Sequence, residues 1–471
     1  MTSVYRVILA CLVLGSVPGD PVMAQKDPVA TWLTDPARSI LFQQQPDMSF
    51  SKEKGDAGTV IAIDEKKVYQ QIDGFGWALT GGSAHWLMHM SPGARAALLR
   101  ELFTTDSNHI GGSYVRISIG ASDLNDHVFS YDDLPAGETD TSMKHFDLGP
   151  DRKDVVPVLQ EILRLNPTLR ILASPWSAPT WMKTNHDTRG GSLMPQYYAA
   201  YARYFVHYIL AMQNEGIPIS AVTVQNEPLH PGNNPSMFMP AAQEAEFIRG
   251  YLGPAIEKDR LMTRIIIYDH NADRPDYPDS ILKDPGASAY VDGSAFHLYA
   301  GDISALSALH DSFPDKNLYF TEQWVGAPGN FGRDIPEHIR NLIIGATRNW
   351  CKTVIEWNLA SDPHYEPHTD RGGCDRCLGA VTIDGDSVHR NPAYYIIAHA
   401  AKFVIPGSSR IGSNADDSLP NVAFRTPKGK AVLIVLNNSG SERTFTVTFR
   451  GRAFHPQLNA GAVATYVFRI D

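Results

Sequence analysis

Two glutamates each follow directly on an apolar, strand-like run. Glu227 ends the segment Ala221-Val222-Thr223-Val224-Gln225-Asn226, and Glu322 ends the segment Leu318-Tyr319-Phe320-Thr321. Two carboxylates that flank a scissile bond are the machinery of glycoside hydrolysis: one protonates the leaving oxygen, and the other attacks the anomeric carbon or activates water. Each glutamate alone could be a buried ion-pair partner, for example of Arg116. Two such glutamates at separate strand ends favour an active site over two structural ion pairs.

Other side chains suited to sugar binding or charge stabilisation also fall at the ends of strand-like runs. They are Arg116, Trp176, Asn226, His297, Tyr299 and Trp357. Taken singly, each tryptophan is more often a core residue than a sugar platform. Their common position at strand ends predicts that they gather around the two glutamates.

Eight strand-like runs alternate with amphipathic segments. The predicted strands are 72–78, 114–119, 169–173, 221–225, 264–268, 293–297, 318–321 and 353–357, and helical spacing occurs in 91–102, 155–165, 196–214, 240–252 and 335–349. Eight β-then-α units indicate an α/β fold of the (β/α)₈ TIM-barrel type. A doubly wound sheet is the alternative, and the unit count and the absence of a Gly-rich phosphate loop disfavour it.

The sequence predicts four regions along the chain. Residues 1–24 form a signal peptide, 25–70 an otherwise irregular segment whose strand 59–63 joins a side β-module, 71–402 the catalytic barrel, and 403–471 a C-terminal β-module. The last region consists of short strands separated by Gly, Asn, Ser and Pro, which is typical of a small β-sandwich.

The N-terminus carries an export pattern. Arg6 precedes the apolar run 7–14, and Val22-Met23-Ala24 offers small residues for cleavage. The run is far shorter than the roughly 18 apolar residues that a transmembrane helix needs, so we expect a periplasmic or extracellular protein without stable membrane insertion. A lipoprotein site at Cys11 is the less favoured alternative. The net charge of −10 without a basic stripe argues against a nucleic-acid partner, and the oligomeric state stays open.

Three cysteines remain after the predicted cleavage. Cys351 follows Trp350 in an apolar stretch and is expected to be a buried thiol. Cys374 and Cys377, with His364 and His368 nearby, could form a zinc site. Because that spacing is irregular, a Cys374–Cys377 disulfide or loose thiols are favoured, and no metal or cofactor is expected.

Four motifs together resemble glycoside hydrolase family 30, the glucosylceramidase and β-1,6-glucanase family. They are Gly74-Phe75-Gly76, the block from Leu172 to Asn185 with Ser174-Pro175-Trp176 and Pro179-Thr180-Trp181, the run Val222–Pro228, and Trp357-Asn358-Leu359. The resemblance extends from about residue 59 to the end of the chain. It implies a (β/α)₈ barrel with a side β-module and retaining hydrolysis of β-glycosides.

The resemblance also assigns roles. Glu227 matches the acid/base, Glu322 the nucleophile, and Asn226 the residue that bonds the sugar 2-OH. The resemblance matches Trp176 and Trp357 to aromatic walls, and Arg116, His297 and Tyr299 to groups beside the nucleophile. Trp324 is predicted to be a further platform.

Two departures bear on the substrate. Gly81 stands where glucosylceramidases have an acid, and Gln323-Trp324-Val325 is a bulky turn. Both favour β-1,6-glucan or simple β-glucosides. The alternatives are an inverting or xylan-active enzyme and a non-catalytic carbohydrate-binding relative.

Overall fold

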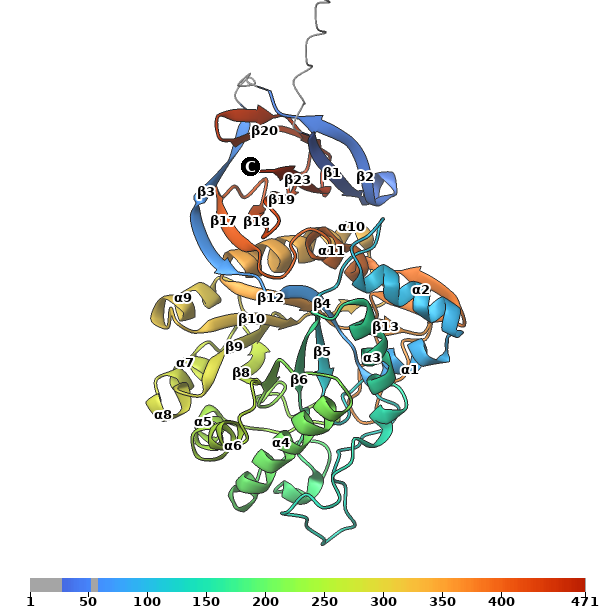
Figure 1. Cartoon of the computed structure of the whole chain (residues 1–471), viewed down its shortest axis with the longest axis vertical. Helices are drawn as coiled ribbons and strands as arrows, with labels where there is room; N and C mark the ends of the chain where they lie inside the picture. Colours follow the sequence, from blue (N-terminus) through green and yellow to red (C-terminus); the bar gives the residue numbers. More distant parts are fainter. Residues whose placement is uncertain (1–27, 52–57, 471) are drawn as a thin grey trace, which may run out of the picture.

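The computed structural model describes residues 28–51 and 58–470, arranged as a β-module stacked on a barrel (Figure 1). The predicted signal peptide lies outside the described residues. Within these residues, none of the helices combines the length and the apolar character needed to cross a bilayer.

Eight parallel strands close into a barrel in the order β10-β12-β4-β5-β6-β7-β8-β9. Their bounds are β4 (Gly74–Ala78), β5 (Tyr114–Ser118), β6 (Arg170–Ser174), β7 (Ala221–Thr223), β8 (Arg264–Asn271), β9 (Val291–His297), β10 (Asn317–Glu322) and β12 (Cys351–Glu356). Each of the eight predicted strands is present within a few residues. The closed sheet confirms the (β/α)₈ barrel and excludes the doubly wound alternative.

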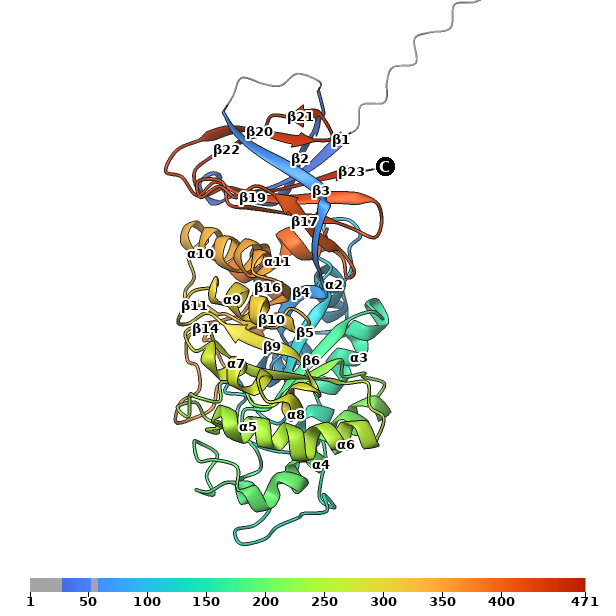
Figure 2. The same ribbon diagram turned by 90° about the vertical axis from the view of Figure 1, so that its left-hand side faces the viewer.

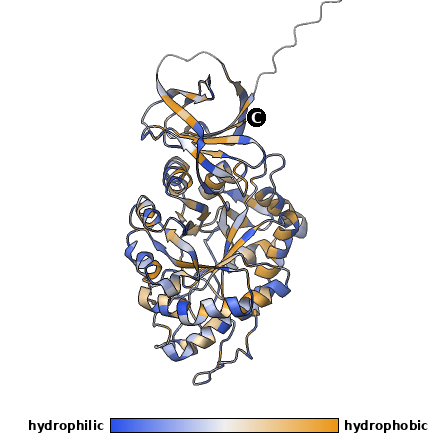
Figure 3. Cartoon of the chain, turned by 60° about the vertical axis from the view of Figure 1, so that its left-hand side comes forward, coloured by the Kyte–Doolittle hydropathy of each residue, from blue (hydrophilic) through white to orange (hydrophobic). Residues whose placement is uncertain are grey.

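The strands are apolar on both faces because both faces are buried. Inward side chains form one layer inside the barrel: Tyr114, Leu172, Ala221, Ile266, Ala295, Tyr319 and Ile355. Outward side chains pack against the surrounding helices in one large core, and Figure 3 shows hydrophobic residues along these strands.

The helices surround the barrel. They are α1 (Gly81–His89), α2 (Pro92–Phe103), α3 (Val155–Leu165), α4 (Tyr198–Asn214), α5 (Ala241–Phe247), α6 (Gly253–Lys258), α7 (Asp276–Leu282), α8 (Pro285–Ser288), α9 (Ala305–Ser312), α10 (Phe331–His338) and α11 (Pro392–Ala401). The five predicted helical segments fall on α2, α3, α4, α5 and α10, the last two of which continue into π-helical segments, Ile248–Leu252 and Ile339–Ala346. Helices α1, α6, α7, α8, α9 and α11 were not predicted, although Thr80 caps α1 by accepting a hydrogen bond from the amide of Ser83 at 3.0 Å.

The β-module is one sheet in the order β2-β1-β23-β19-β18-β17-β3-β20-β21, with β22 paired to β20. Its strands are β1 (Pro28–Asp35), β2 (Ile40–Ser49), β3 (Thr59–Gln71), β17 (Ser409–Ser413), β18 (Asn421–Arg425), β19 (Lys430–Leu436), β20 (Arg443–Phe449), β21 (Arg452–Phe454), β22 (Gln457–Leu458) and β23 (Val463–Arg469). The N-terminal segment therefore supplies three strands. The expectation of irregular chain before residue 50 is wrong for β1 and β2, because β1 pairs with β23 at the other end of the sequence.

Helices α10 and α11 lie between the module and the barrel strands (Figures 1 and 2). Buried His399 of α11 lies within hydrogen-bond distance of the Thr34 hydroxyl at 2.7 Å and of the Thr465 hydroxyl at 2.9 Å. Both threonines belong to module strands, so the two parts share a buried polar contact. Short strands complete the rim of the barrel: β11 (Val325–Gly326), β13 (Ala360–Ser361), β14 (Cys377–Leu378), β15 (Val381–Asp384) and β16 (Ser387–Arg390).

Candidate active site

A cavity of about 320 Å³ opens at the carboxyl ends of the barrel strands. Six residues predicted from the sequence line it: Trp176, Glu227, Tyr299, Glu322, Trp324 and Trp357. The other lining residues were not predicted from the sequence. They are Asp123, His230, Asn233, His270, Asn271, Cys374 and Cys377. The three remaining predicted residues, Arg116, Asn226 and His297, are buried and bonded to one another or to the glutamates.

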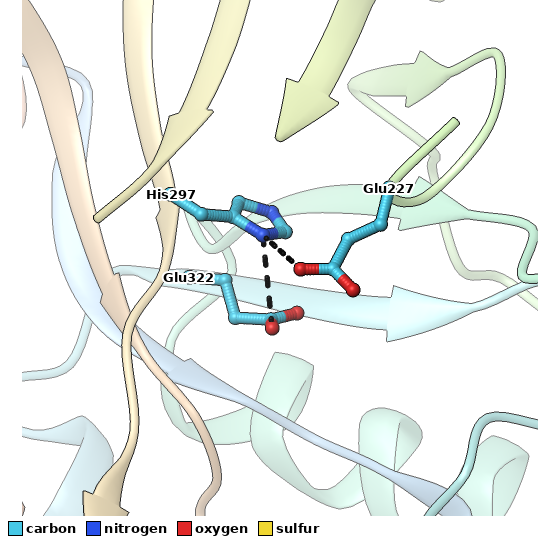
Figure 4. Close-up of side chains that lie close together, drawn as sticks. All are labelled: Glu227, His297 and Glu322. Atoms are coloured by element: carbon cyan, nitrogen blue, oxygen red, sulfur yellow. Dashed lines mark hydrogen bonds and ion pairs between the residues drawn. The ribbon is translucent and has the colours of Figure 1, made fainter. Parts of the chain in front are cut away.

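The two glutamates face each other across His297 (Figure 4). His297 Nδ1 lies 3.2 Å from Glu227 Oε1 and 3.7 Å from Glu322 Oε1. One oxygen of each glutamate and one nitrogen of His297 all lie within 4.8 Å of one another. Glu227 reaches this position with a left-handed backbone, φ +45°, which turns the chain sharply after β7.

Arg116 lies beneath the pair, fully buried in the barrel. Its guanidinium donates to Glu322 Oε2 at 2.5 Å, to Asn226 Oδ1 at 2.6 Å, to Asp269 Oδ2 at 2.7 Å and to Ser174 Oγ at 3.2 Å. Burial disfavours its charge, but Asp269 and Glu322 more than compensate and raise the pKa of Arg116. Arg116 is therefore a fixed positive charge that orients four residues at once.

Asp269 is the central residue that the sequence analysis missed. Its carboxylate accepts hydrogen bonds from Arg116 at 2.7 Å, Ser174 at 3.0 Å, Thr223 at 2.8 Å and Thr321 at 2.6 Å, and it lies 3.2 Å from His297 Nε2. Burial opposes ionisation, but Arg116 and His297 hold the pKa of Asp269 well below its usual range. A register shift in β8 beside Tyr268 and Asp269, both left-handed, turns this side chain inward.

Aromatic rings form one side of the cavity. The Trp176 and Trp357 rings lie 5.3 Å apart, and the Arg116 guanidinium is 4.8 Å from the centre of the Trp176 ring. Trp324 forms a backbone bridge with Trp357. Tyr299 also lines the cavity and donates its hydroxyl to Glu322 Oε1 at 3.0 Å.

The two glutamates influence each other's protonation. Burial raises the pKa of Glu227, but the hydrogen bond and charge of His297 outweigh it, so this pKa lies below its ordinary value. Burial and the charge of Glu227 raise the pKa of Glu322, although His297 and Arg116 oppose them. Because the charge of Glu227 is one cause of the high pKa of Glu322, a proton placed on Glu227 makes Glu322 more acidic.

A third carboxyl, Asp123, lines the cavity. Burial, together with the charges of Glu322 and Glu227, raises the pKa of Asp123 to about 8. Gly81 begins α1, and a Cβ there would lie 2.0 Å from Asn125 Nδ2. Position 81 thus has no room for a side chain. The cavity still has a third carboxyl group, because Asp123 supplies one.

The converging atoms of Glu227, His297 and Glu322 have the number and spacing of a metal site. Burial would lower the pKa of His297, but Glu322, Asp269 and Glu227 raise it to about 9. An imidazolium has no free lone pair for a metal, so a protonated His297 supplies the positive charge between the two carboxyl groups. The alternative zinc site at the two later cysteines is wrong: Cys374 and Cys377 form a disulfide. Cys351 is a buried free thiol, as predicted.

Fold and site together define a glycoside hydrolase built on a (β/α)₈ barrel. Residues 72–404 match the glycosyl hydrolase family 30 TIM-barrel domain, and residues 407–466 match the family 30 β-sandwich domain. The chain belongs to glycoside hydrolase family 30.

The similar proteins include endo-1,6-β-glucanases and glucosylceramidases. An endo-1,6-β-D-glucanase of Aspergillus fumigatus is 33% identical over 424 residues, covering 84% of this chain and 85% of that protein. The lysosomal acid glucosylceramidase of Mus musculus is 30% identical over 443 residues, covering 88% and 84%. Among solved structures, one of an endo-β-1,6-glucanase is 34% identical with a TM-score of 0.88, covering 94% of this chain and 100% of that chain.

Proposed function

We propose that this protein is a retaining β-glycoside hydrolase that cleaves β-1,6-glucan or other β-glucosides. The observation that carries the proposal is the short distance between the carboxyl groups of Glu227 and Glu322, which have one oxygen each within 4.8 Å of the other. Carboxyl groups about 5–5.5 Å apart are typical of retaining enzymes, whereas inverting enzymes leave roughly 6.5–9.5 Å for a water molecule.

Glu322 is the nucleophile in this proposal. Arg116 and Tyr299 donate to its two oxygens, and these contacts favour the carboxylate once Glu227 holds the proton. Glu322 attacks the anomeric carbon while Glu227 protonates the departing oxygen, which gives a glycosyl ester with inverted configuration. Glu227 then takes a proton from water, which displaces Glu322 and restores the original configuration.

Asn226, Trp176 and Trp357 hold the sugar in this proposal. Arg116 donates to Asn226 Oδ1, which leaves the amide Nδ2 as the donor for the sugar 2-OH. Trp176 and Trp357 offer aromatic faces to the apolar C–H groups of the ring. Asp123, whose raised pKa keeps it partly protonated at neutral pH, can exchange hydrogen bonds with a further hydroxyl.

The leaving-group side of the cavity favours a sugar over a lipid. Glu227 is flanked there by Asn233, whose Nδ2 donates to Glu227 Oε2 at 3.4 Å, and by His230 and His270. Burial lowers the pKa of His270 to about 4, so its ring is neutral. The neutral His270 ring and the Asn233 amide match hydroxyl groups. The endo-1,6-β-glucanase relatives point to the same substrate.

We also propose that the protein is exported with cleavage after residue 24. The apolar run 7–14 supports this. So does the Cys374–Cys377 disulfide, because such bonds persist in oxidising compartments. Mass spectrometry of the mature N-terminus tests this proposal.

Product analysis tests the reaction. Proton NMR of fresh β-1,6-glucan digests should show the β-anomer first; an α-anomer would refute retention. Glu322→Gln should abolish turnover and leave the fold intact. Glu227→Gln should lose about 10²–10⁴-fold activity on glucan but much less on a substrate with an activated phenolate leaving group. Parallel assays on β-1,6-glucan, a simple β-glucoside and glucosylceramide identify the substrate.

A further inference from the structure

A disulfide forms part of the cavity wall. Cys374 and Cys377 both line the cavity. Cys377 is 3% exposed and packs in one apolar cluster with Trp176, Trp357 and Leu124, and Cys374 packs against that cluster. The disulfide thus lies beside the two tryptophans that line the cavity.

The disulfide-closed turn, residues 374–377, is joined to the loop that follows catalytic strand β10. Strand β11 pairs with β14, so that Gly326 lies opposite Cys377. The Ala327 amide donates to the Arg376 carbonyl at 2.9 Å. A Cβ on Gly326 would lie 3.4 Å from the Trp324 ring, so this ring lies against the two-stranded sheet.

The chain just before the turn holds the loop of Asp123. The buried Thr369 amide donates to the Asp123 carbonyl at 2.9 Å. A Cβ on Gly373 would lie 2.2 Å from the Thr369 carbonyl oxygen, so the chain next to Cys374 passes in close contact with Thr369. Two cavity residues from different loops, Asp123 and Trp324, therefore depend on the same turn.

We propose that the Cys374–Cys377 disulfide is a positioning element for the wall of the glycone subsite, fixing Trp324 and Asp123 against the sugar that Glu322 attacks. This inference rests on the proposed function, because the glycone side is identified by the role of Glu322. We expect the disulfide to act on sugar binding more than on proton transfer, since Cys377 belongs to the apolar cluster of Trp176 and Trp357 and neither cysteine takes part in the buried hydrogen bonds of Arg116, Glu322, His297 and Glu227.

Reduction of the disulfide distinguishes an effect on sugar binding from an effect on the chemical step. Dithiothreitol supplies two electrons, breaks the S–S bond and leaves two thiols. The loop then keeps its backbone pairing with β11 but loses its covalent closure. We expect KM for β-glucosides to rise roughly fivefold, the factor for re-ordering one or two side chains on binding. We expect kcat to change by less than about twofold, because the glutamate pair is untouched.

The experiment compares oxidised and reduced enzyme on 4-nitrophenyl β-D-glucoside and β-1,6-glucan. The double variant Cys374→Ala/Cys377→Ala should show the raised KM without reductant and no further response to it. Cys351→Ala is the matched control, because Cys351 is buried and unpaired; it should respond to reductant as the wild type does. Thiol titration verifies reduction. Tryptophan fluorescence should rise on reduction, because disulfides quench adjacent indoles, and this readout needs no turnover.

Two results would overturn the inference while the proposed function stands. The first is an unchanged KM and fluorescence in fully reduced, active enzyme, which makes the disulfide a stabilising crosslink only. The second is a fall in kcat at constant KM. If the oxidised enzyme hydrolyses no β-glucoside, the proposed function fails. A fluorescence response to reduction in that case still supports the position of the disulfide beside the tryptophans of the cavity wall.

Discussion

Asp269→Asn tests whether the buried charge network beneath the cavity is needed for catalysis. The substitution keeps the size of the side chain and removes its charge. Arg116 then has only Glu322 as a buried counter-charge, and His297 loses a carboxylate 3.2 Å from Nε2. Removing one partner of a buried ion pair costs about 3–5 kcal/mol.

The same change should disturb the catalytic geometry. Arg116 contacts Glu322 and Asn226 through hydrogen bonds of 2.5 and 2.6 Å, and both contacts depend on the guanidinium staying in place. A misplacement near 1 Å costs about 10²-fold in rate, so we expect kcat/KM to fall about 10²-fold.

The stability loss translates into a measurable shift of the melting temperature. With an unfolding entropy of about 2.1 cal/mol/K per residue, a barrel that unfolds as one unit over residues 72–404 should lose roughly 4–7 °C in Tm. Circular dichroism measures this shift, and initial rates at 25 °C measure activity while both proteins are folded.

Asp73→Asn is the matched control. Asp73 precedes β4 at the opposite end of the barrel, is buried, and contacts Arg170 at 2.9 Å and Lys352 at 3.5 Å. It should lose stability but keep wild-type kcat/KM. The reasoning is refuted if Asp269→Asn keeps full activity, or if Asp73→Asn loses as much activity as Asp269→Asn.

Three further predictions follow from the burial of single groups. His297 has a folded pKa of about 9 and an unfolded pKa of about 6.5, so its stabilising contribution, about 3 kcal/mol, is complete below pH 6.5 and disappears as the pH rises through 9. The difference in unfolding free energy between wild type and His297→Gln should therefore shrink over that window in urea titrations; a difference independent of pH contradicts the protonated histidine. Gly81→Asp should destabilise the protein by about 1–3 kcal/mol through overpacking, because its Cβ would meet Asn125 at 2.0 Å; an unchanged urea midpoint would show that Asn125 moves freely. Gly76→Ala should prevent folding, since its Cβ would lie 1.8 Å from a backbone oxygen of β5. Gly93→Ala is the control, because a Cβ there would have no atom within 4 Å; this variant should be neutral or stabilise the protein by up to about 1 kcal/mol. Expression levels and melting temperatures of the two variants test this prediction.

The sequence predicted the barrel because each barrel strand is a short apolar run, buried on both faces, and strand-like and helix-like runs alternate. It did not predict β1 and β2. Strand β2 carries polar residues along much of its length and is exposed at several positions, and β1 finds its second partner in β23, more than 400 residues away. Local patterns cannot report a partner that only the folded chain supplies.

The active site shows the same division between what local sequence patterns predict and what only the folded chain supplies. The sequence alone indicated that Glu227 and Glu322 end two separate strands of one barrel, because strand ends can be read from apolar runs and the carboxyl ends of parallel strands meet. The tertiary structure alone decided Asp269. By simple alternation from inward Ile266, Tyr268 would point into the barrel and Asp269 away from it. Two left-handed residues and a register shift reverse this order. The distance between the two glutamates and the disulfide wall beside them were likewise set by side chains that meet only when the barrel closes.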